Sequence, residues 1–474
     1  MNESLIMKKN LTKKAYFNET ATKRVKWKRR NSFYHKSLNK YFSFIIPAGS
    51  KVLEIGCGDG ELLNAVKPSH GVGVDFSEAS IAIAREKFPN LHFLVDNAED
   101  LHLTEKFDYI ILSDLVGSLE DVQKAFSNLK QVSYSHTRIV LSYYNFIWEP
   151  FLKFAEWSGL KMKQPRQNWL TTGDIKGLLE VEDFESITIN RKLLLPVFIP
   201  LLNLIFNKFL ANLPLLNQLT LTFIITARMK EKHTKDHSVS ILVPARNEKG
   251  NIENAIKRTP EFGTSQQFIF VEGNSSDGTW EEMQRVQKVY PDHDIFIMKQ
   301  SGKGKGNAVR EGFDKATGDI LMILDADLTM PPEDLPKYYR ALVENKGEFI
   351  NGSRLVYPQD KEAMRFLNLM GNKFFSWFFT YLLGQRLRDT LCGTKVLFKK
   401  DYEIIKRNRN FFGDFDPFGD FDLIFGAAKL NFRIIEIPIR YRERAYGSTQ
   451  ISRFKHGWLL IKMSLFAARK MKFF

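Results

Sequence analysis

The chain has 474 residues, more than the roughly 250–300 over which one hydrophobic core keeps growing, so we expect two domains. Its composition is globular, and its net charge of +15 suits an anionic partner: nucleic acid, acidic lipid or a phosphate-bearing substrate. The two cysteines, Cys57 and Cys392, form no CxxC pair, which excludes a disulfide framework or a zinc site and fits a reducing cytoplasm. No apolar stretch of signal-peptide length follows Met1, so we expect the protein to remain in the cytoplasm.

Residues 1–40 form a basic arm or helix. Positions 8–40 contain twelve Lys or Arg and a single acid, Glu19. Such a run is usually a solvated arm, and we expect one here. Because Phe17, Trp27, Phe33 and Tyr34 are interleaved with the charges, a contact with RNA or a membrane stays open.

Residues 41–230 alternate short apolar strands with helical segments, the pattern of an α/β domain. A buried strand, KVLEIG, leads into a glycine-rich turn, where Gly residues let the backbone approach a ligand closely. Three further apolar strands end in polar residues. The residues at these four strand ends are Glu54, Gly56, Gly58, Gly60, Asp75, Asp96, Ala98, Ser113 and Asp114.

This set resembles the class I S-adenosylmethionine-dependent methyltransferases, which have a Rossmann-like fold. The resemblance implies that Glu54, Gly56, Gly58 and Gly60 hold the methionine end of the cofactor. It implies that Asp75 binds the ribose and that Asp96 and Ala98 frame the adenine. Ser113, at the tip of the fourth strand, is a further candidate for cofactor binding. The methyl acceptor is not predicted, although acceptor pockets form in this fold near Asp114, Tyr143, Tyr144, Asn145 and Trp148.

The longest apolar run, residues 193–206, is interrupted by Pro196, Pro200 and Asn203 and is too short to span a membrane as a helix. We expect a buried or membrane-surface segment and slightly favour burial. The run falls between the last two predicted strands of this domain, where it would roof the acceptor pocket. An apolar roof suits a lipid-linked acceptor.

A charged stretch around residue 230 separates the halves, and we assign residues 231–238 to a linker. Residues 239–474 again alternate strands and helices. A strand ending at 329 places Asp325 and Asp327 two residues apart, so both carboxylates can reach one Mg²⁺ or Mn²⁺ and, through it, a diphosphate. The preceding turns and loop supply polar groups at strand ends and a basic glycine-rich segment. These residues are Pro244, Asn247, Glu248, Glu272, Asp277 and Lys303.

The order of these elements resembles glycosyltransferase family 2, inverting enzymes with a GT-A fold, and more narrowly its dolichol-phosphate mannose synthase and polyprenyl-phosphate glycosyltransferase branch. The resemblance implies that Glu248 and Asp277 contact the nucleoside and that Asp325 and Asp327 hold the metal diphosphate. It also implies that Arg354 and Arg444 meet phosphate oxygens of the donor or lipid acceptor. A hydroxyl acceptor would instead require a base such as Asp389 or Asp422. The sequence departs from the family pattern at Glu272-Gly273, Leu328-Thr329, Cys392, Thr394 and Gln450.

The expected protein is a bifunctional enzyme of glycolipid or cell-surface polysaccharide synthesis, peripheral at the cytoplasmic face of the inner membrane. It would use S-adenosylmethionine, a divalent metal, a nucleotide-diphospho-sugar and a polyprenyl phosphate, without nucleic acid. Helix 374–383 and the basic helix after residue 455 are candidate membrane contacts, although the latter equally suits docking on its own domain. Transfer to a glycan or protein hydroxyl, an RNA-binding or RNA-modifying role, and a non-catalytic scaffold role for one domain stay as alternatives.

Overall fold

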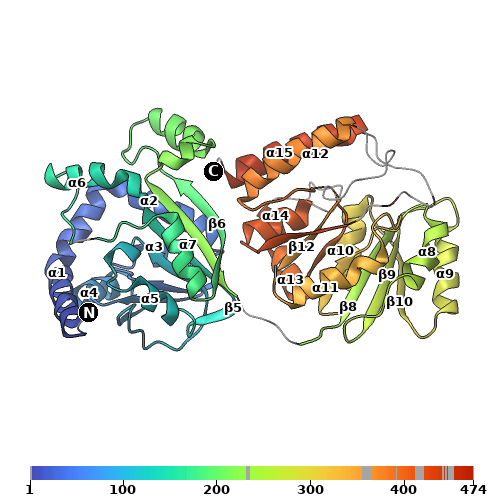
Figure 1. Ribbon diagram of the computed structural model, residues 1–474, viewed down its shortest axis with the longest axis horizontal. Helices are drawn as coiled ribbons and strands as arrows, with labels where there is room; N and C mark the ends of the chain where they lie inside the picture. The colour runs from blue at the N-terminus through green and yellow to red at the C-terminus, as the bar shows by residue number, and fades with distance from the viewer. Residues whose placement is uncertain are drawn as a thin grey trace. The chain divides into compact units, whose positions relative to one another are not determined.

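Each half of the chain builds its own seven-stranded sheet in the computed structural model (Figure 1). The chain divides into two units, Met1–Glu231 and Lys232–Lys472. The structure describes residues 3–165, 167–230, 235–354, 366–390, 392–411, 421–439, 442, 446 and 453–472, without side-chain positions for 3–12, 366–373, 410 and 453–460.

The first sheet has the strand order β3-β2-β1-β4-β5-β7-β6. Strands β1 to β5 pair in parallel, whereas β7 is antiparallel to both β5 and β6, so the sheet is mixed. Because parallel strands end at one edge, the loops after β1, β2 and β4 meet there. The strands are β1 (Lys51–Ile55), β2 (His70–Asp75), β3 (His92–Val95), β4 (Phe107–Ser113), β5 (Ser133–Tyr144), β6 (Phe184–Lys192) and β7 (Thr222–Met229).

Both faces of this sheet are buried. Along β1, Val52 packs in one apolar cluster and Leu53 in another, as the alternation of strand side chains requires. The α/β class predicted for this half is therefore confirmed. The helices of the unit are α1 (Glu3–Arg30), α2 (Ser32–Ile45), α3 (Glu61–Ala65), α4 (Glu78–Lys87), α5 (Val122–Asn128), α6 (Glu149–Trp157) and α7 (Thr172–Val181).

The basic run at the amino terminus is not a solvated arm. It forms α1 and α2, and Phe17 and Ala21 on α1 are buried. On α2, Tyr34, Leu38 and Phe42 are buried at helical spacing in the cluster that also contains Val52 of β1. These helices therefore belong to the first unit and contribute to its core.

The apolar run after β6 is also different from the expected buried segment. Leu193 is buried, but most apolar side chains from Val197 to Leu219 are exposed. The segment contains a π-helical turn, Leu204–Phe209, and two short 3-10 helices, Leu210–Asn212 and Leu216–Leu219. Burial was favoured because the run is hydrophobic. Hydrophobicity does not show whether other elements pack against the segment, and here most of its side chains are left exposed.

The second sheet has the order β10-β9-β8-β11-β13-β12-β14. Strands β8 to β11 pair in parallel, and β13 is antiparallel to β11 and β12, so this sheet is also mixed. One buried cluster runs from Val239 through Ile350 to Ile439. The strands are β8 (Val239–Ala245), β9 (Gln266–Glu272), β10 (Asp294–Lys299), β11 (Ile320–Ile323), β12 (Phe349–Ser353), β13 (Lys395–Phe398) and β14 (Ile434–Pro438).

The carboxyl-terminal helix packs on α12, with Met463, Ala467 and Ala468 buried and Leu465 exposed. Docking on its own unit is thus the arrangement seen. None of the helices in the described ranges combines the length and apolarity needed to cross a bilayer. The helices of the second unit are α8 (Ile252–Lys257), α9 (Thr279–Val289), α10 (Lys305–Lys315), α11 (Leu335–Val343), α12 (Phe366–Leu383), α13 (Lys399–Arg407), α14 (Phe421–Lys429) and α15 (Arg453–Met471).

Candidate functional sites

The turn after β1 is built from three glycines with positive φ: Gly56 at 74°, Gly58 at 55° and Gly60 at 73°. A side chain is strained in this region, so glycine is the residue that suits all three positions. At Gly60, a Cβ would also lie 2.6 Å from the Phe93 ring. The backbone N–H of Gly58 donates to Asp75 Oδ2 at 2.9 Å, which fixes the turn against the end of β2.

Asp75 accepts a second backbone hydrogen bond, from Ser77 N to its Oδ1 at 2.9 Å. Burial raises the pKa of Asp75, while these two hydrogen bonds and nearby Arg24 oppose the rise. The carboxylate is therefore held in one orientation where β2 ends.

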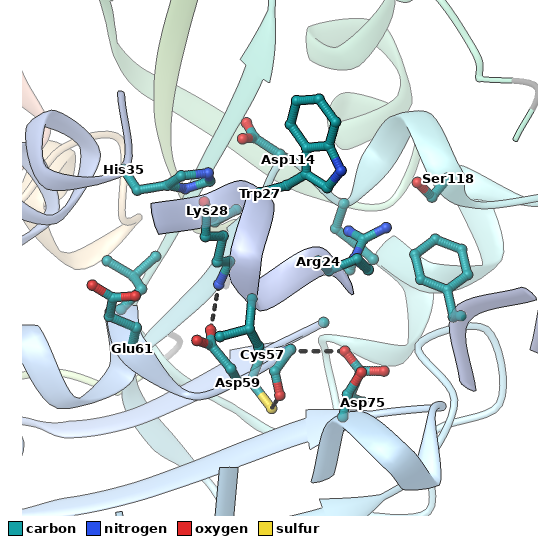
Figure 2. Close-up of a pocket in the computed structure, with 18 of the residues that line it drawn as sticks. Arg24, Trp27, Lys28, His35, Cys57, Asp59, Glu61, Asp75, Asp114 and Ser118 are labelled. Atoms are coloured by element: carbon teal, nitrogen blue, oxygen red, sulfur yellow. Dashed lines mark hydrogen bonds and ion pairs between the residues drawn. The ribbon is translucent and has the colours of Figure 1, made fainter. Parts of the chain in front are cut away.

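A cavity of about 240 Å³ opens beside this turn, between the strand ends and helices α1 and α2 (Figure 2). Arg24, Trp27 and Lys28 of α1 and His35 of α2 line it. Lys28 forms an ion pair with Asp59, whose other oxygen lies 3.0 Å from Lys87 Nζ. Burial opposes ionisation of Asp59, but the two lysines lower its pKa.

Glu54 is fully enclosed at the end of β1 and also lines the cavity. Its Oε2 has no hydrogen-bond partner among the described residues. Burial raises the pKa of Glu54 to about 8 despite the nearby Lys28 ammonium. An orphaned buried carboxyl oxygen beside a cavity fits a cationic ligand group, because such a group would supply the missing partner.

Asp114 lies at the far side of the same cavity, directly after β4. It accepts hydrogen bonds from Tyr34 Oη at 2.8 Å and Ser142 Oγ at 3.1 Å. Burial raises the pKa of Asp114 to about 6 although both hydrogen bonds oppose the rise. Asp114 and Tyr144 line the cavity among the predicted acceptor-side residues. The Tyr143 hydroxyl instead donates to Asn168 O, and Trp148 Nε1 donates to Leu219 O.

Five of the eight predicted cofactor residues surround this cavity: Glu54, Gly56, Gly58, Asp75 and Ser113. Gly60 shapes the turn as the residue before α3.

Asp96 and Ala98 do not line the cavity. Asp96 orders its own loop, accepting from His102 N at 2.9 Å and lying 3.0 Å from His102 Nδ1. Ala98 packs against the core.

Sequence reasoning missed the contribution of α1. Phe17, Ala21, Arg24 and Lys28 all line the cavity, and their spacing of four, three and four residues places them on one helix face. The sequence contains that spacing, which indicates a packed helix, but the many basic residues of the run favoured a solvated arm.

A second cavity, of about 520 Å³, opens at the carboxyl ends of β8 and β11 in the other unit. Asp325 and Asp327 both line it, directly after β11. Pro244, Glu248 and Lys303 line it as well, as predicted for a nucleotide-sugar site. Sequence reasoning missed the further lining residues Arg246, Asn274, Gln300 and Lys305.

Lys305 lies 2.6 Å from Asp325 Oδ1 at the start of α10. Burial works against ionisation of Asp325, but Lys305, together with Lys395 and Arg354, lowers its pKa. Gly393 packs against the same pair: a Cβ there would lie 1.9 Å from Asp325 Oδ2 and 2.5 Å from Lys305 Nζ. The ionised Asp325 is therefore held in a space that only glycine leaves open.

Asp327 accepts hydrogen bonds from Thr329 N at 3.1 Å and Thr329 Oγ1 at 2.8 Å. In the described ranges, no three His, Cys, Asp or Glu side chains gather to hold a metal ion. The donor set thus comprises two carboxylates beside two lysines, which fits a Mg²⁺ or Mn²⁺ ion that completes its ligands with substrate phosphates and water.

Asn247, Glu272 and Asp277 lie outside the lining of this cavity and organise the loops behind it. Asn247 Oδ1 accepts from Ser276 N at 2.9 Å, and Glu272 Oε1 accepts from Ser275 N at 2.5 Å. Asp277 accepts from Thr279 N at 3.1 Å, immediately before α9 begins at Thr279.

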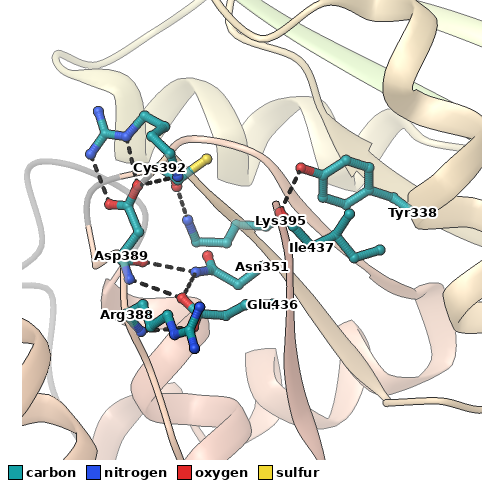
Figure 3. Close-up of polar contacts among 9 residues, drawn as sticks. Tyr338, Asn351, Arg388, Asp389, Cys392, Lys395, Glu436 and Ile437 are labelled. Atoms are coloured by element: carbon teal, nitrogen blue, oxygen red, sulfur yellow. Dashed lines mark hydrogen bonds and ion pairs between the residues drawn. The ribbon is translucent and has the colours of Figure 1, made fainter. Parts of the chain in front are cut away.

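Arg354 and Asp389, both predicted as catalytic residues, form a bidentate ion pair. Arg354 Nε lies 2.7 Å from Asp389 Oδ2, and Arg354 Nη2 lies 2.8 Å from Oδ1. Glu436 accepts from the backbone N–H groups of Arg388, at 2.7 Å, and Asp389, at 2.9 Å, while Asn351 donates to Asp389 O at 2.8 Å (Figure 3). Burial raises the pKa of Glu436.

Asp422, in the first turn of α14, lies 3.3 Å from Arg310 Nε of α10 and 2.9 Å from Arg409 Nε. It does not line the cavity. The predicted Arg444 lies outside the described residues.

Each half of the chain matches the model of a known family. Residues 27–189 match the family model of a methyltransferase domain, and residues 240–404 match that of glycosyl transferase family 2. A dolichol-phosphate mannosyltransferase of Pyrococcus furiosus is 29% identical over 218 residues, 45% of this chain and 59% of that protein. An undecaprenyl-phosphate 4-deoxy-4-formamido-L-arabinose transferase of Proteus mirabilis is 26% identical over 231 residues, 47% of this chain and 65% of that protein. The matches therefore span less than two thirds of either relative.

Among solved structures, a SAM-dependent methyltransferase of Thermotoga maritima, described as a possible histamine N-methyltransferase, aligns with 45% of this chain and 98% of its own. Its sequence identity is 17% and its TM-score is 0.36.

Proposed function

We propose that this chain, which joins a methyltransferase domain to a family 2 glycosyltransferase domain, transfers a methyl group from S-adenosylmethionine and a sugar from a nucleotide-diphospho-sugar. The observation that carries the sugar-transfer half is the cavity at the ends of β8 and β11. There Asp325 and Asp327 lie beside Lys303 and Lys305, a charge pattern that suits a metal-bound diphosphate.

In the second unit, Asp325 and Asp327 would hold Mg²⁺ or Mn²⁺, which when bound neutralises the diphosphate leaving group. Lys303 and Lys305 would contact the phosphate oxygens. Pro244 and Glu248 would border the nucleoside. The loop residues Asn247, Glu272 and Asp277 would position this wall rather than touch the donor, because their side chains lie outside the cavity lining and accept hydrogen bonds from neighbouring backbone.

A polyprenyl phosphate is the acceptor that we propose. Its phosphate is already anionic at neutral pH and needs no strong base. Asp389 is held by Arg354, and Asp422 lies between Arg310 and Arg409, so both candidate bases for a hydroxyl acceptor are engaged in ion pairs. The two relatives are named for transfer to dolichol phosphate and undecaprenyl phosphate, which supports the same acceptor class.

In the first unit, the glycine turn and Glu54 would bind the methionine end of the cofactor, and Asp75 would bind the ribose. Methyl transfer requires no covalent enzyme group, so the residues act by orienting the acceptor and excluding water. Helices α1 and α2 close the cavity over these groups. Asp114 and Tyr144 would face the acceptor.

Sugar transfer can be tested with a panel of UDP- and GDP-sugars, a short polyprenyl phosphate and Mn²⁺, comparing wild type with Asp325→Ala. We expect a metal-dependent product that the variant does not form. Transfer to a glycan hydroxyl but not to the lipid phosphate would overturn the acceptor assignment. Folded protein without transfer from any donor would favour a scaffold role for this domain.

A further inference from the structure

The first unit exposes two apolar segments that are unlike the rest of its surface. In residues 146–157, which include α6, five large apolar side chains are exposed, and in residues 197–219 twelve are. None of the α6 residues is buried, and Trp157 is 82% exposed. In the second segment, Leu201 is 77% and Leu215 is 84% exposed. An apolar patch of this extent on a folded domain indicates an interaction site.

The two segments form one surface, which we call the apolar surface. Trp148 Nε1 donates to Leu219 O at 2.8 Å, and Asn145 Nδ2 donates to Gln218 O at 2.7 Å. The rings of Phe33 on α2 and Phe198 lie 5.6 Å apart. In Figure 1, α6, α2 and the green coils after β6 lie at the same end of the unit.

Asparagine side chains pair several backbone groups in and beside the second segment, whose course is irregular. Asn207 accepts from Leu195 N and donates to Leu195 O, both at 2.8 Å. Asn203 accepts from Ile199 N and donates to Val197 O, and Asn212 donates to Lys208 O. Side-chain amides thus pair backbone groups that water would otherwise solvate. This pairing favours contact with lipid, because a lipid environment offers no hydrogen bonds and makes unpaired backbone groups costly.

The charges around the apolar surface are mostly basic. Residues 193–219 contain one charged side chain, Lys208, and no acid. In the α6 segment, the two acids, Glu149 and Glu156, form ion pairs with Lys153 and Lys161. On α2, Lys36 and Lys40 are exposed, one and two turns beyond Phe33. An apolar face with a basic rim complements an anionic lipid surface, with apolar chains below the headgroups and cations among them.

We propose that the apolar surface inserts into the interfacial layer of an anionic membrane and docks the first unit there. This proposal does not depend on either transfer reaction. It has one consequence for the proposed methyl transfer: the chain after α6 lines the cofactor cavity through Lys161, Met162 and Gln164. Docking would bring that rim to the bilayer, which suits a lipid-linked methyl acceptor.

The first test is sedimentation of the full chain with vesicles of phosphatidylcholine, with and without phosphatidylglycerol. We expect binding to the anionic vesicles that weakens as salt is added. Phe151→Ser/Trp157→Ser and Leu201→Ser/Leu215→Ser should each weaken binding at least about tenfold, since they remove inserting side chains that contribute nothing to the core. Val181→Ser is the matched control, because Val181 is 64% exposed on α7 of the same unit, and it should bind like wild type.

A second measurement locates the contact without relying on loss of binding. Both native cysteines are buried, so Leu215→Cys and Val181→Cys can each be labelled with a polarity-sensitive dye. Anionic vesicles should shift the emission at position 215 to the blue and leave position 181 unchanged.

Unchanged vesicle binding in both double variants, or equal shifts at positions 215 and 181, would overturn the proposal. So would light scattering that shows a dimer dissociated by Phe151→Ser/Trp157→Ser in protein that does not bind vesicles, because the surface would then serve self-association.

Discussion

Glu54 illustrates how one buried carboxyl group links stability to ligand binding. Its pKa of about 8 in the folded chain lies above the ordinary glutamate value of 4.5, because burial disfavours the ionised form. The folded state therefore retains a proton that the unfolded state releases. A cationic cofactor group near the orphaned Oε2 would reverse this preference by pairing with the carboxylate.

We predict that stability of the first unit falls as pH rises from about 4.5 to about 8 because of Glu54. In that window the unfolded chain binds fewer protons at this site, so the free energy of unfolding decreases by up to about 1.4 kcal/mol per pH unit. Glu54→Gln should remove this slope. Denaturant unfolding of both proteins at several pH values measures it, with exposed Glu78→Gln on α4 as the control that should track wild type. Parallel slopes in Glu54→Gln and wild type would contradict the assignment.

Gly393 lies so close to Asp325 and Lys305 that adding a Cβ atom would disturb their ion pair. We predict that Gly393→Ala reduces sugar transfer at least about a hundredfold, because the new Cβ must displace Asp325 or Lys305 from their present contact. Thermal unfolding should show that the fold survives. Gly177→Ala is the control, since nothing lies within 4 Å of the Cβ that it adds, and it should leave transfer unchanged. Full activity in Gly393→Ala would show that the observed Asp325 position is not required.

At the scale of the element, α1 combines a role in packing with a role in charge balance. Phe17 and Ala21 are buried, and Arg24 and Lys28 turn toward the acidic strand ends on the same face. Burial lowers the pKa of Arg24 while Asp75 opposes the fall. The basic residues on this face therefore line the first cavity, and the inner face of α1 gives the RNA-binding alternative no support.

We predict that Lys28→Ala destabilises the first unit by about 1–3 kcal/mol and weakens cofactor binding. The substitution leaves the buried Asp59 paired with Lys87 alone of these two lysines, and an under-compensated buried charge is costly. Lys23→Ala, exposed on the same helix, should change neither quantity. Denaturant unfolding and calorimetric titration with S-adenosylmethionine compare the two variants. Equal effects from both substitutions would show a general loss of charge rather than loss of this ion pair.

Elements with a clear hydrophobic period were predictable, whereas the side-chain partners of loop residues were not. The buried strand at 51–56 and the strand before Asp325 followed from apolar runs ended by turn residues. Nothing local indicates that Asp96 bonds to His102 or that Arg354 pairs with Asp389, because loop conformation decides both. In α1 the period was present, but the count of charges favoured the solvated interpretation. For residues 193–206, hydrophobicity slightly favoured burial over a membrane-surface position, but most of the apolar side chains from Val197 to Phe206 are exposed, because exposure depends on which elements pack nearby.

At the scale of the whole molecule, each unit has its own sheet and its own buried clusters. The apolar clusters of the first unit lie on the two faces of its sheet. No residue in these clusters comes after Met229. The main cluster of the second unit begins at Val239. Among the residues that the structure describes, those lining each cavity all come from one unit.

We therefore predict that the chain can be cut near residue 232 into two fragments that each fold. Domains with separate cores fold as units, and the fragments exceed the size at which a single core becomes marginal. The amino-terminal fragment should bind S-adenosylmethionine as tightly as the intact chain does. The carboxyl-terminal fragment should retain sugar transfer at the rate of the intact chain, and a cut within α10 serves as the control that should abolish it. A carboxyl-terminal fragment that folds but transfers sugar only after the amino-terminal fragment is added would show instead that the sugar-transfer site requires the methyltransferase domain.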